Sequence, residues 1–277
     1  MEQMLIFGLG YAASRIADRL RAAGWRIDAT GSAGNLAFDD REAVNAALGQ
    51  ASHVLSSVPP GANDPVLIRY GEALRSHGGW LGYLSSTGVY GDTGGAWVDE
   101  TAGIGAGRRS QRAETDSQWM QLGARVFRLP GIYGPGRSAL ERIGEGKARR
   151  IDLPAQVFSR VYVDDIASGV IAALDAPAGA YNLADDEPCS QNAVIEEACR
   201  LLGLAPPPLQ SLDDAGLSPQ ARAFYSENRR VANGKAKRVL GWRLRYPTYR
   251  EGLRALSAST VPSTARAAPA TASVSQR

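Results

Sequence analysis

Short apolar runs alternate with amphipathic stretches through the first half of the chain. The runs expected to form strands cover residues 4–7, 26–30, 36–38, 53–58, 80–85 and 125–129. The stretches that repeat apolar residues at helical spacing cover residues 12–23, 42–48, 66–76 and 109–122. Strands that alternate with helices are typical of βα units, which build a parallel sheet. The pattern therefore predicts an α/β fold, a Rossmann-type doubly wound parallel sheet.

The pattern changes after Pro130. A loop rich in Gly and Pro is followed by a basic stretch and by several short helical segments that end near Trp242. We expect residues 1–135 to form the Rossmann domain, completed by about 156–184, and residues 136–256 to form a smaller C-terminal lobe. Residues 257–277 are almost entirely Ala, Ser, Thr, Pro and Val, which bury too little apolar surface to offset the entropy of ordering. A disordered tail is predicted there.

The composition excludes few functions. Among the 277 residues, 31 are basic and 28 are acidic, and this near balance gives no indication of a nucleic-acid partner. No apolar run approaches membrane-spanning length and the first residues lack a signal-peptide pattern, so we expect no membrane partner, a cytoplasmic location and a small-molecule substrate. Cys189 and Cys199 have neither CxxC spacing nor a histidine cluster beside them, and no metal site is predicted.

A glycine pattern follows the first expected strand and opens the first expected helix. In it Gly8 permits a tight turn, Gly10 lets the backbone approach a pyrophosphate, and Ala13 allows the helix to pack closely on the strand. The helix N-terminus then supplies N–H donors to phosphate oxygens. The residues expected to bind NAD(P) in this segment are Gly8, Leu9, Gly10, Tyr11, Ala12 and Ala13.

The end of the second expected strand bears on the choice between NAD and NADP. Residues 29–32 contain neither the acidic residue that favours NAD nor an arginine that would favour NADP. With Thr30 and Ser32 as hydrogen-bond donors, the site leans slightly toward NADP, and both cofactors stay open. Asp39 either receives the adenine amine or is a solvated loop residue. Leaving the next strand, the residues expected along the cofactor are Ser56, Ser57 and Val58.

Two further motifs carry a family resemblance. Residues 85–91 read Ser-Ser-Thr-Gly-Val-Tyr-Gly, and residues 128–136 read Arg-Leu-Pro-Gly-Ile-Tyr-Gly-Pro-Gly. With residues 158–167 and 240–253, they make the chain similar to the extended short-chain dehydrogenase/reductases, which include the NAD-dependent epimerase/dehydratases. The likeness covers about residues 4–256. It implies that Pro130 and Ile132 lie along the cofactor, that the smaller lobe binds substrate, and that a homodimer forms through helices near 66–76 and 109–122.

The resemblance implies catalytic roles and also exposes a departure. In the family, a Ser or Thr three places before Val-Tyr-Gly hydrogen-bonds the reacting oxygen, which here is Ser86 with Thr87 beside it. The family's Tyr-x-x-x-Lys pair is missing, since residues 92–119 contain no Tyr and no Lys. Aligning Asp116 with the acidic residue that ends this motif puts Arg108 and Arg112 at the two positions. The chain is thus similar to the atypical members.

Arginine cannot replace tyrosine as a proton donor, because its pKa stays above about 12. Arg108 and Arg112 either hold an anionic substrate or the cofactor phosphates, or only solvate a surface helix. Tyr90 and Tyr133 are alternative hydroxyls near the nicotinamide, although each is more often a packing residue in this motif. Arg160 either grips a substrate phosphate or carboxylate or makes a structural salt bridge.

Two functions remain open from the sequence. The first is an NAD(P)-dependent oxidoreductase or epimerase/dehydratase-like enzyme that acts on a small, anionic or nucleotide-sugar-like substrate. The second is a non-catalytic NAD(P)-binding redox sensor or regulatory protein, which the missing Tyr and Lys support. The scaffold alone does not decide between them.

Overall fold

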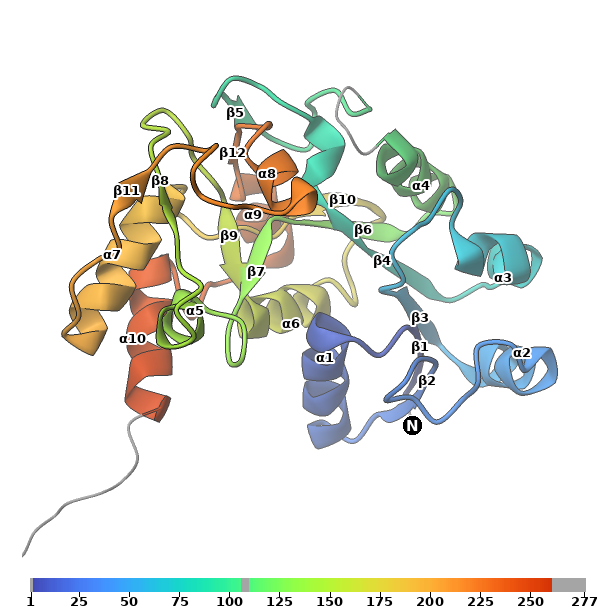
Figure 1. The fold of residues 1–277 in the computed structure, drawn as a ribbon. Coiled ribbons are helices and arrows are strands. Elements are labelled where there is room, and N and C mark those ends of the chain that lie inside the picture. Colours follow the sequence, from blue (N-terminus) through green and yellow to red (C-terminus); the bar gives the residue numbers. More distant parts are fainter. Residues whose placement is uncertain (1, 106–109, 261–277) are drawn as a thin grey trace, which may run out of the picture.

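The computed structural model describes residues 2–105 and 110–260, and a six-stranded parallel sheet forms its centre (Figure 1). The sheet consists of β1 (Gln3–Phe7), β2 (Arg26–Ala29), β3 (His53–Ser56), β4 (Trp80–Ser86), β6 (Arg125–Leu129) and β10 (Gly179–Asn182). Its spatial order is β10-β6-β4-β3-β1-β2, with every neighbouring pair parallel. The predicted doubly wound α/β fold is confirmed.

Helices cover both faces of this sheet (Figure 1). On one face, α1 (Tyr11–Ala22) packs against α6 (Val163–Ala172), and both bury an apolar stripe in one core cluster. On the other face lie α2 (Arg41–Gln50), α3 (Pro65–Arg75) and α4 (Ser110–Gln121), which contribute to a second cluster. Each helix thus buries the face that its apolar spacing marks, and the expected helices form with their ends shifted by no more than two residues.

The other elements form a lobe over the carboxyl ends of the central strands (Figure 1). They are η1 (Thr87–Tyr90), β5 (Trp97–Val98), β7 (Gly131–Tyr133), α5 (Ala139–Gly144), β8 (Arg150–Ile151), β9 (Arg160–Tyr162), α7 (Gln191–Leu202), β11 (Leu209–Gln210), α8 (Pro219–Phe224), β12 (Arg230–Val231), α9 (Gly234–Leu240) and α10 (Tyr249–Thr260). Three two-stranded ladders pair β11 with β8, β12 with β5, and β7 with β9. Of the disordered tail predicted for residues 257–277, residues 257–260 form the end of α10 and the rest lies outside the described residues. Among those described, no helix is both long and apolar enough for a membrane span.

One expected strand is wrong. Residues 36–38 form no strand, and only Leu36 makes an isolated bridge, to Thr30. The turn before it folds Asn35 back onto the edge of β2, where the Asn35 side chain accepts from the Ala29 N–H at 2.8 Å. That N–H is therefore unavailable to a neighbouring strand. Leu36 and Phe38 instead pack as partly buried side chains against the second core cluster.

A buried ion pair fastens α4 to the middle of the sheet. Arg128 donates to both carboxylate oxygens of Asp116, from Nη2 at 2.7 Å and from Nε at 3.1 Å, and both residues are almost fully buried. Ser85 Oγ also donates to Asp116, at 2.7 Å. On its other side, Arg128 donates to the Tyr90 hydroxyl at 3.0 Å, which donates to Asn182 at 2.8 Å. This network joins β4, β6, β10, η1 and α4 where the lobe begins.

Asp185 is a buried carboxyl group just beyond β10. Burial raises its pKa to about 8, although the positive charge of Arg160 acts in the opposite direction. In an unfolded chain the same group titrates near pH 4. The folded protein therefore binds this proton more tightly than the unfolded chain does. It follows that the group makes folding less favourable as the pH rises from about 4 through 8.

Replacement of Asp116 by Ala should destabilise the fold by about 3–5 kcal/mol, because it leaves the Arg128 charge buried and unpaired. Urea unfolding of the wild type and the variant measures the difference. Asp18→Ala is the matched control, since Asp18 pairs with Arg21 on the surface and its loss should cost less than about 1 kcal/mol. A loss for Asp116→Ala as small as that of the control would contradict the role assigned to the pair.

Asp185→Asn should weaken the pH dependence of stability. Asparagine cannot ionise, so the variant should lose a slope of up to about 1.4 kcal/mol per pH unit between pH 4 and 8 and be the more stable protein at the alkaline end. Urea unfolding at several pH values measures this. Asp186→Asn, at an exposed pair with Lys237, should leave the slope unchanged. Equal slopes for wild type and Asp185→Asn would refute the assignment.

Candidate functional site

The glycine loop between β1 and α1 is held by its neighbours on the sheet. Gly8 has a φ of +82°, and its N–H donates to Thr30 Oγ1 at 3.1 Å. The Leu9 N–H donates to the Thr30 carbonyl at 2.8 Å. A Cβ on Gly8 would lie 2.9 Å from Val58 Cγ2, so both the backbone angle and the space require glycine. The loop is thus a fixed turn that ends at the first residue of α1.

The N-terminus of α1 faces open space. Its N-cap is Gly10, which offers no side-chain hydrogen bond, whereas Asp40 and Asp64 cap α2 and α3. The first-turn N–H groups of α1 therefore lack a side-chain acceptor, and the helix dipole places partial positive charge there. A Cβ on Gly10 would meet nothing within 4 Å. This cradle fits the pyrophosphate of a dinucleotide, which the N–H groups at the start of α1 would bind.

The other expected cofactor residues lie around this loop in different roles. Leu9, Ala12, Ala13 and Ser56 are buried, while Ser57 and Val58 flank Gly8. Thr30 is buried and supports the loop, so its hydroxyl already accepts the Gly8 N–H. Ser32 is exposed beyond β2. Asp39 forms an ion pair with Arg69 at 2.9 Å.

A loop of the lobe reaches back to α1. The Tyr11 hydroxyl donates to the Pro135 carbonyl at 3.0 Å, and the Arg137 guanidinium lies 5.1 Å from the centre of the Tyr11 ring. A Cβ on Gly134 would lie 2.7 Å from the Tyr11 hydroxyl. The segment that follows β7 is therefore packed directly against the start of the helix that forms the phosphate cradle.

Ser86 and Thr87 line a cavity of about 130 Å³ where β4 and β6 end. Ser86 Oγ accepts from the Gly88 N–H at 3.1 Å, which leaves its own hydrogen available for donation. The other lining residues are Gly88, Pro130, Gly131, Val157, Phe158, Ser159, Phe224, Glu227, Arg229 and Val231. The cavity thus lies between the central sheet and the lobe, and we call it the serine chamber.

A second cavity of about 340 Å³ adjoins the first, and we call it the arginine chamber. The two share Gly131, Phe158, Ser159 and Phe224 in their walls. The arginine chamber also contacts Ile132, Tyr133, Arg137, Arg142 and Arg160. The structure thus brings the expected residues Ile132, Tyr133 and Arg160 to one cavity beside Ser86 and Thr87.

The two candidate tyrosines are held by other groups. The Tyr90 hydroxyl lies inside the buried network with Arg128 and Asn182 and lines neither chamber. The Tyr133 hydroxyl donates to the Thr248 carbonyl at 3.4 Å. Burial raises the pKa of both hydroxyls above the ordinary tyrosine value. Both arrangements favour packing roles over proton donation.

The candidate arginines differ in their surroundings. Arg160 is buried and donates to the carbonyls of Phe158, Cys189 and Ser190 at 3.0, 3.2 and 3.3 Å, which favours a structural role through backbone contacts. Arg112 is half-buried on α4, one turn before Asp116. Arg108 lies outside the described residues.

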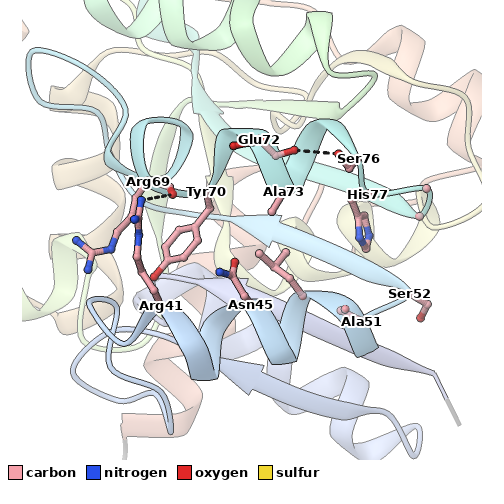
Figure 2. Close-up of a pocket in the computed structure, with 14 residues that line it drawn as sticks. Arg41, Asn45, Ala51, Ser52, Arg69, Tyr70, Glu72, Ala73, Ser76 and His77 are labelled. Carbon is pink, nitrogen blue, oxygen red and sulfur yellow. Dashed lines mark hydrogen bonds between the residues drawn. The ribbon is translucent and has the colours of Figure 1, made fainter.

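A separate groove of about 880 Å³ runs between α2 and α3 (Figure 2). Arg41 and Arg69 stand at one end of it and Ser52 and His77 at the other. It shares no lining residue with the glycine loop or with either chamber. Its volume therefore does not make it part of the candidate site.

Several site residues carried no recognisable signal in the sequence. Arg142 and Phe224 belong to short helices in the lobe, and Glu227 and Arg229 follow Phe224 in the chain. They reach the chambers only because the lobe folds over the ends of β4 and β6. The exposed ring of Phe224 beside charged residues is a signal of a binding site. That signal requires the structure, because the sequence does not give the exposure of Phe224.

Comparisons with solved structures place the fold among known proteins. The chain is 42% identical to a functionally unknown conserved protein from Silicibacter pomeroyi DSS, with a TM-score of 0.84 over 94% of this chain and 99% of that one. A putative NAD-dependent epimerase/dehydratase from Methylobacillus flagellatus is 21% identical, with a TM-score of 0.72 over 93% and 98% of the two chains. The human epimerase family protein SDR39U1, solved with NADPH, is 15% identical, with a TM-score of 0.73 over 92% and 99%.

Curated relatives match over shorter segments, and no family model matches the chain. A 3-diazoavenalumate denitrifying reductase from a Streptomyces species is 33% identical over 144 residues, which are 48% of this chain and 46% of the relative. Protein YeeZ of Escherichia coli K12 is 26% identical over 171 residues, 60% of this chain and 58% of the relative. The matches thus span about half the length of these relatives. The chain belongs to the same family as the Silicibacter pomeroyi protein, and its fold is that of the NAD-dependent epimerase/dehydratases, the extended short-chain dehydrogenase/reductases.

Proposed function

We propose that this protein is an NAD(P)-dependent oxidoreductase of the atypical extended type, which acts on a small anionic substrate in the chambers beside Ser86. The observation that carries the proposal is the uncapped N-terminus of α1 behind the fixed turn at Gly8. A dinucleotide whose pyrophosphate binds there has its redox end directed toward the ends of β4 and β6, as ligands of open α/β sheets generally do. The reductase relative supports an enzyme that reduces its substrate.

The surroundings of β2 favour NADP over NAD. The carboxylate of Asp28 accepts from the side chains of Gln3 and Asn35, and that of Asp39 pairs with Arg69. The buried carboxylate on β2 itself, Asp28, is therefore not free to bind the ribose hydroxyls of NAD, which is the interaction that usually selects NAD. Ser32 is exposed and would donate to a 2′-phosphate. Solved relatives of this fold contain NADPH or NAD, so the scaffold accepts both.

The chain's own contribution to catalysis is positioning. When bound, the nicotinamide supplies or accepts hydride. The Ser86 hydroxyl donates a hydrogen bond to the reacting polar atom of the substrate, and the Gly88 N–H, which donates to its oxygen, holds it in place. Among the described residues that line the serine chamber, Glu227 and Arg229 carry charge and form an ion pair at 3.0 Å. Because the hydroxyls of Tyr90 and Tyr133 are both engaged, the proposal assigns the proton that balances hydride transfer to water and gives neither tyrosine an acid role.

A redox sensor is the alternative function. The absence of Tyr and Lys from residues 92–119 favours it, as does the engagement of both nearby tyrosine hydroxyls. A sensor would bind NADPH or NADH tightly yet show no turnover with carbonyl, diazo or nucleotide-sugar substrates. Turnover of any of these, abolished by changes in the serine chamber, supports the enzyme.

We also propose a homodimer through α3 and α4. Ile68 on α3 is 70% exposed and Met120 on α4 is 37% exposed, and a groove of about 700 Å³ lies between the two helices. Light scattering of the purified protein tests this, and a monomeric mass would reject the dimer.

Gly10→Ala should weaken NADPH binding at least about tenfold, because its methyl group fills the space in front of α1. It should change the free energy of unfolding by less than about 1 kcal/mol, since Gly10 has a φ of −92° and no close neighbour. Nicotinamide fluorescence and urea unfolding measure the two effects. Gly49→Ala, on α2 and equally uncrowded, is the control: it should leave NADPH affinity unchanged and stabilise the protein by at most about 1 kcal/mol, because alanine favours the helix. Unaltered NADPH affinity of Gly10→Ala would reject the cradle.

Ser86→Ala should lower kcat/KM roughly 100-fold, because the donor to the reacting atom is lost, and leave NADPH affinity unchanged. Initial rates with NADPH, on whichever compound of the panel the wild type turns over, measure this. Ser86→Thr keeps the hydroxyl and should retain most of the activity. Equal rates for wild type and Ser86→Ala would remove Ser86 from the mechanism.

A further inference from the structure

An aromatic pair stands between the serine chamber and the arginine chamber. The rings of Phe158 and Phe224 are stacked, with centroids 4.5 Å apart and planes 12° from parallel. Phe158 is buried, but Phe224 is 45% exposed. Phe224 lines both chambers and also a third cavity beside α8. An apolar ring thus remains accessible at the junction between the two chambers.

The arginine chamber has an excess of positive charge. Its carboxylates are engaged, since Glu141 accepts from the Ser138 and Gly136 N–H groups at 2.8 and 3.0 Å and Glu145 pairs with Lys147 at 2.9 Å. In the part of the chain that the structure describes, neither Arg137 nor Arg142 has a carboxylate within ion-pair distance. Both guanidinium-bearing residues are exposed and line this chamber.

These features line adjoining chambers. Ser86 lines the serine chamber, Phe224 lines both chambers, and Arg142 lines the arginine chamber and, with Phe224, the third cavity. A planar ring stacks favourably on Phe, and a guanidinium group binds a carboxylate through two parallel hydrogen bonds. A ligand that satisfies all three features has a reacting group, an aromatic ring and an anionic end.

We propose that the substrate is an aromatic carboxylic acid whose ring packs on Phe224 and whose carboxylate binds Arg142. The inference rests on the proposed function and specifies its substrate. It narrows the small anionic substrate to one chemical class. Phe224 would recognise the ring of that substrate and Arg142 its charge, and the two contacts can be tested separately. Arg137, which lies over Tyr11, also lines this chamber and adds positive charge to its wall.

The test is calorimetric binding of 2-naphthoate to the NADPH-loaded protein, with 2-naphthamide and cyclohexanecarboxylate as matched probes. Arg142→Gln should weaken 2-naphthoate binding at least about tenfold and leave 2-naphthamide binding unchanged. Phe224→Leu should weaken 2-naphthoate binding at least about fivefold and leave cyclohexanecarboxylate binding unchanged. Arg149→Gln is the control for net charge, since Arg149 lines only the neighbouring cavity and donates to backbone carbonyls. It should behave as the wild type.

The possible outcomes separate this inference from the proposed function. If NADPH binds and 2-naphthoate does not, the substrate class is overturned while the oxidoreductase proposal stands. If 2-naphthoate binds with the expected variant pattern but neither NADPH nor NADH binds, the oxidoreductase proposal fails and the acid site stands. Equal losses of acid and amide in Arg142→Gln, or tighter binding of UDP-glucose than of 2-naphthoate, would also overturn the aromatic-acid assignment.

Discussion

The carboxylate of Asp116 and the guanidinium of Arg128 meet where α4, β4 and β6 come together, and the order of the candidate site depends on their contact. Two charged groups removed from water are tolerated only when each satisfies the other, and here Ser85 and Tyr90 complete the hydrogen bonding. Although burial disfavours its charge, the pKa of Arg128 stays above the ordinary arginine value because of Asp116. The strand ends that present Ser86 and Pro130 are thereby fixed relative to α4.

The same pair anchors the part of α4 that the sequence analysis aligned with the family's Tyr-x-x-x-Lys motif. Asp116, which the sequence analysis aligned with the acidic residue of the family's motif, is buried and anchors α4 through Arg128. One turn earlier, Arg112 is half-buried and lies near Tyr83. Burial raises the pKa of the Tyr83 hydroxyl above its ordinary value, and the Arg112 charge opposes that rise.

Much of the fold was predictable because it follows from local patterns. Apolar runs and helical spacing identify five central strands and four helices, since both depend on neighbours within one element. The sixth strand, β10, was missed because Gly179–Asn182 is short and pairs with β6, about 50 residues earlier in the chain, across part of the lobe. Residues 36–38 were apolar enough for a strand, but the Asn35 side chain takes the N–H they would have used.

In the candidate site too, the features that depend on local sequence were predictable and those that depend on distant contacts were not. The turn at Gly8 and the start of α1 are encoded within six residues, so the sequence predicts them directly. The Thr30 hydroxyl was expected as a hydrogen-bond donor to the cofactor, but a contact between β2 and the glycine loop directs it to the Gly8 N–H. Phe224 and Arg142 are 82 residues apart in sequence and become neighbours of one cavity only through the packing of the lobe. Such non-local contacts produce no characteristic residue spacing, so the sequence pattern does not predict them.

The hydrogen bond from Tyr11 to Pro135 joins the helix of the phosphate cradle to the loop that borders the arginine chamber. A ligand that shifts this loop alters a contact made by the first residue of α1. Any resulting change in cofactor affinity is matched, by thermodynamic linkage, by an equal effect of the cofactor on that ligand. The hydroxyl of Tyr11 thus gives the protein a direct route for cooperativity between two ligands that need never touch each other.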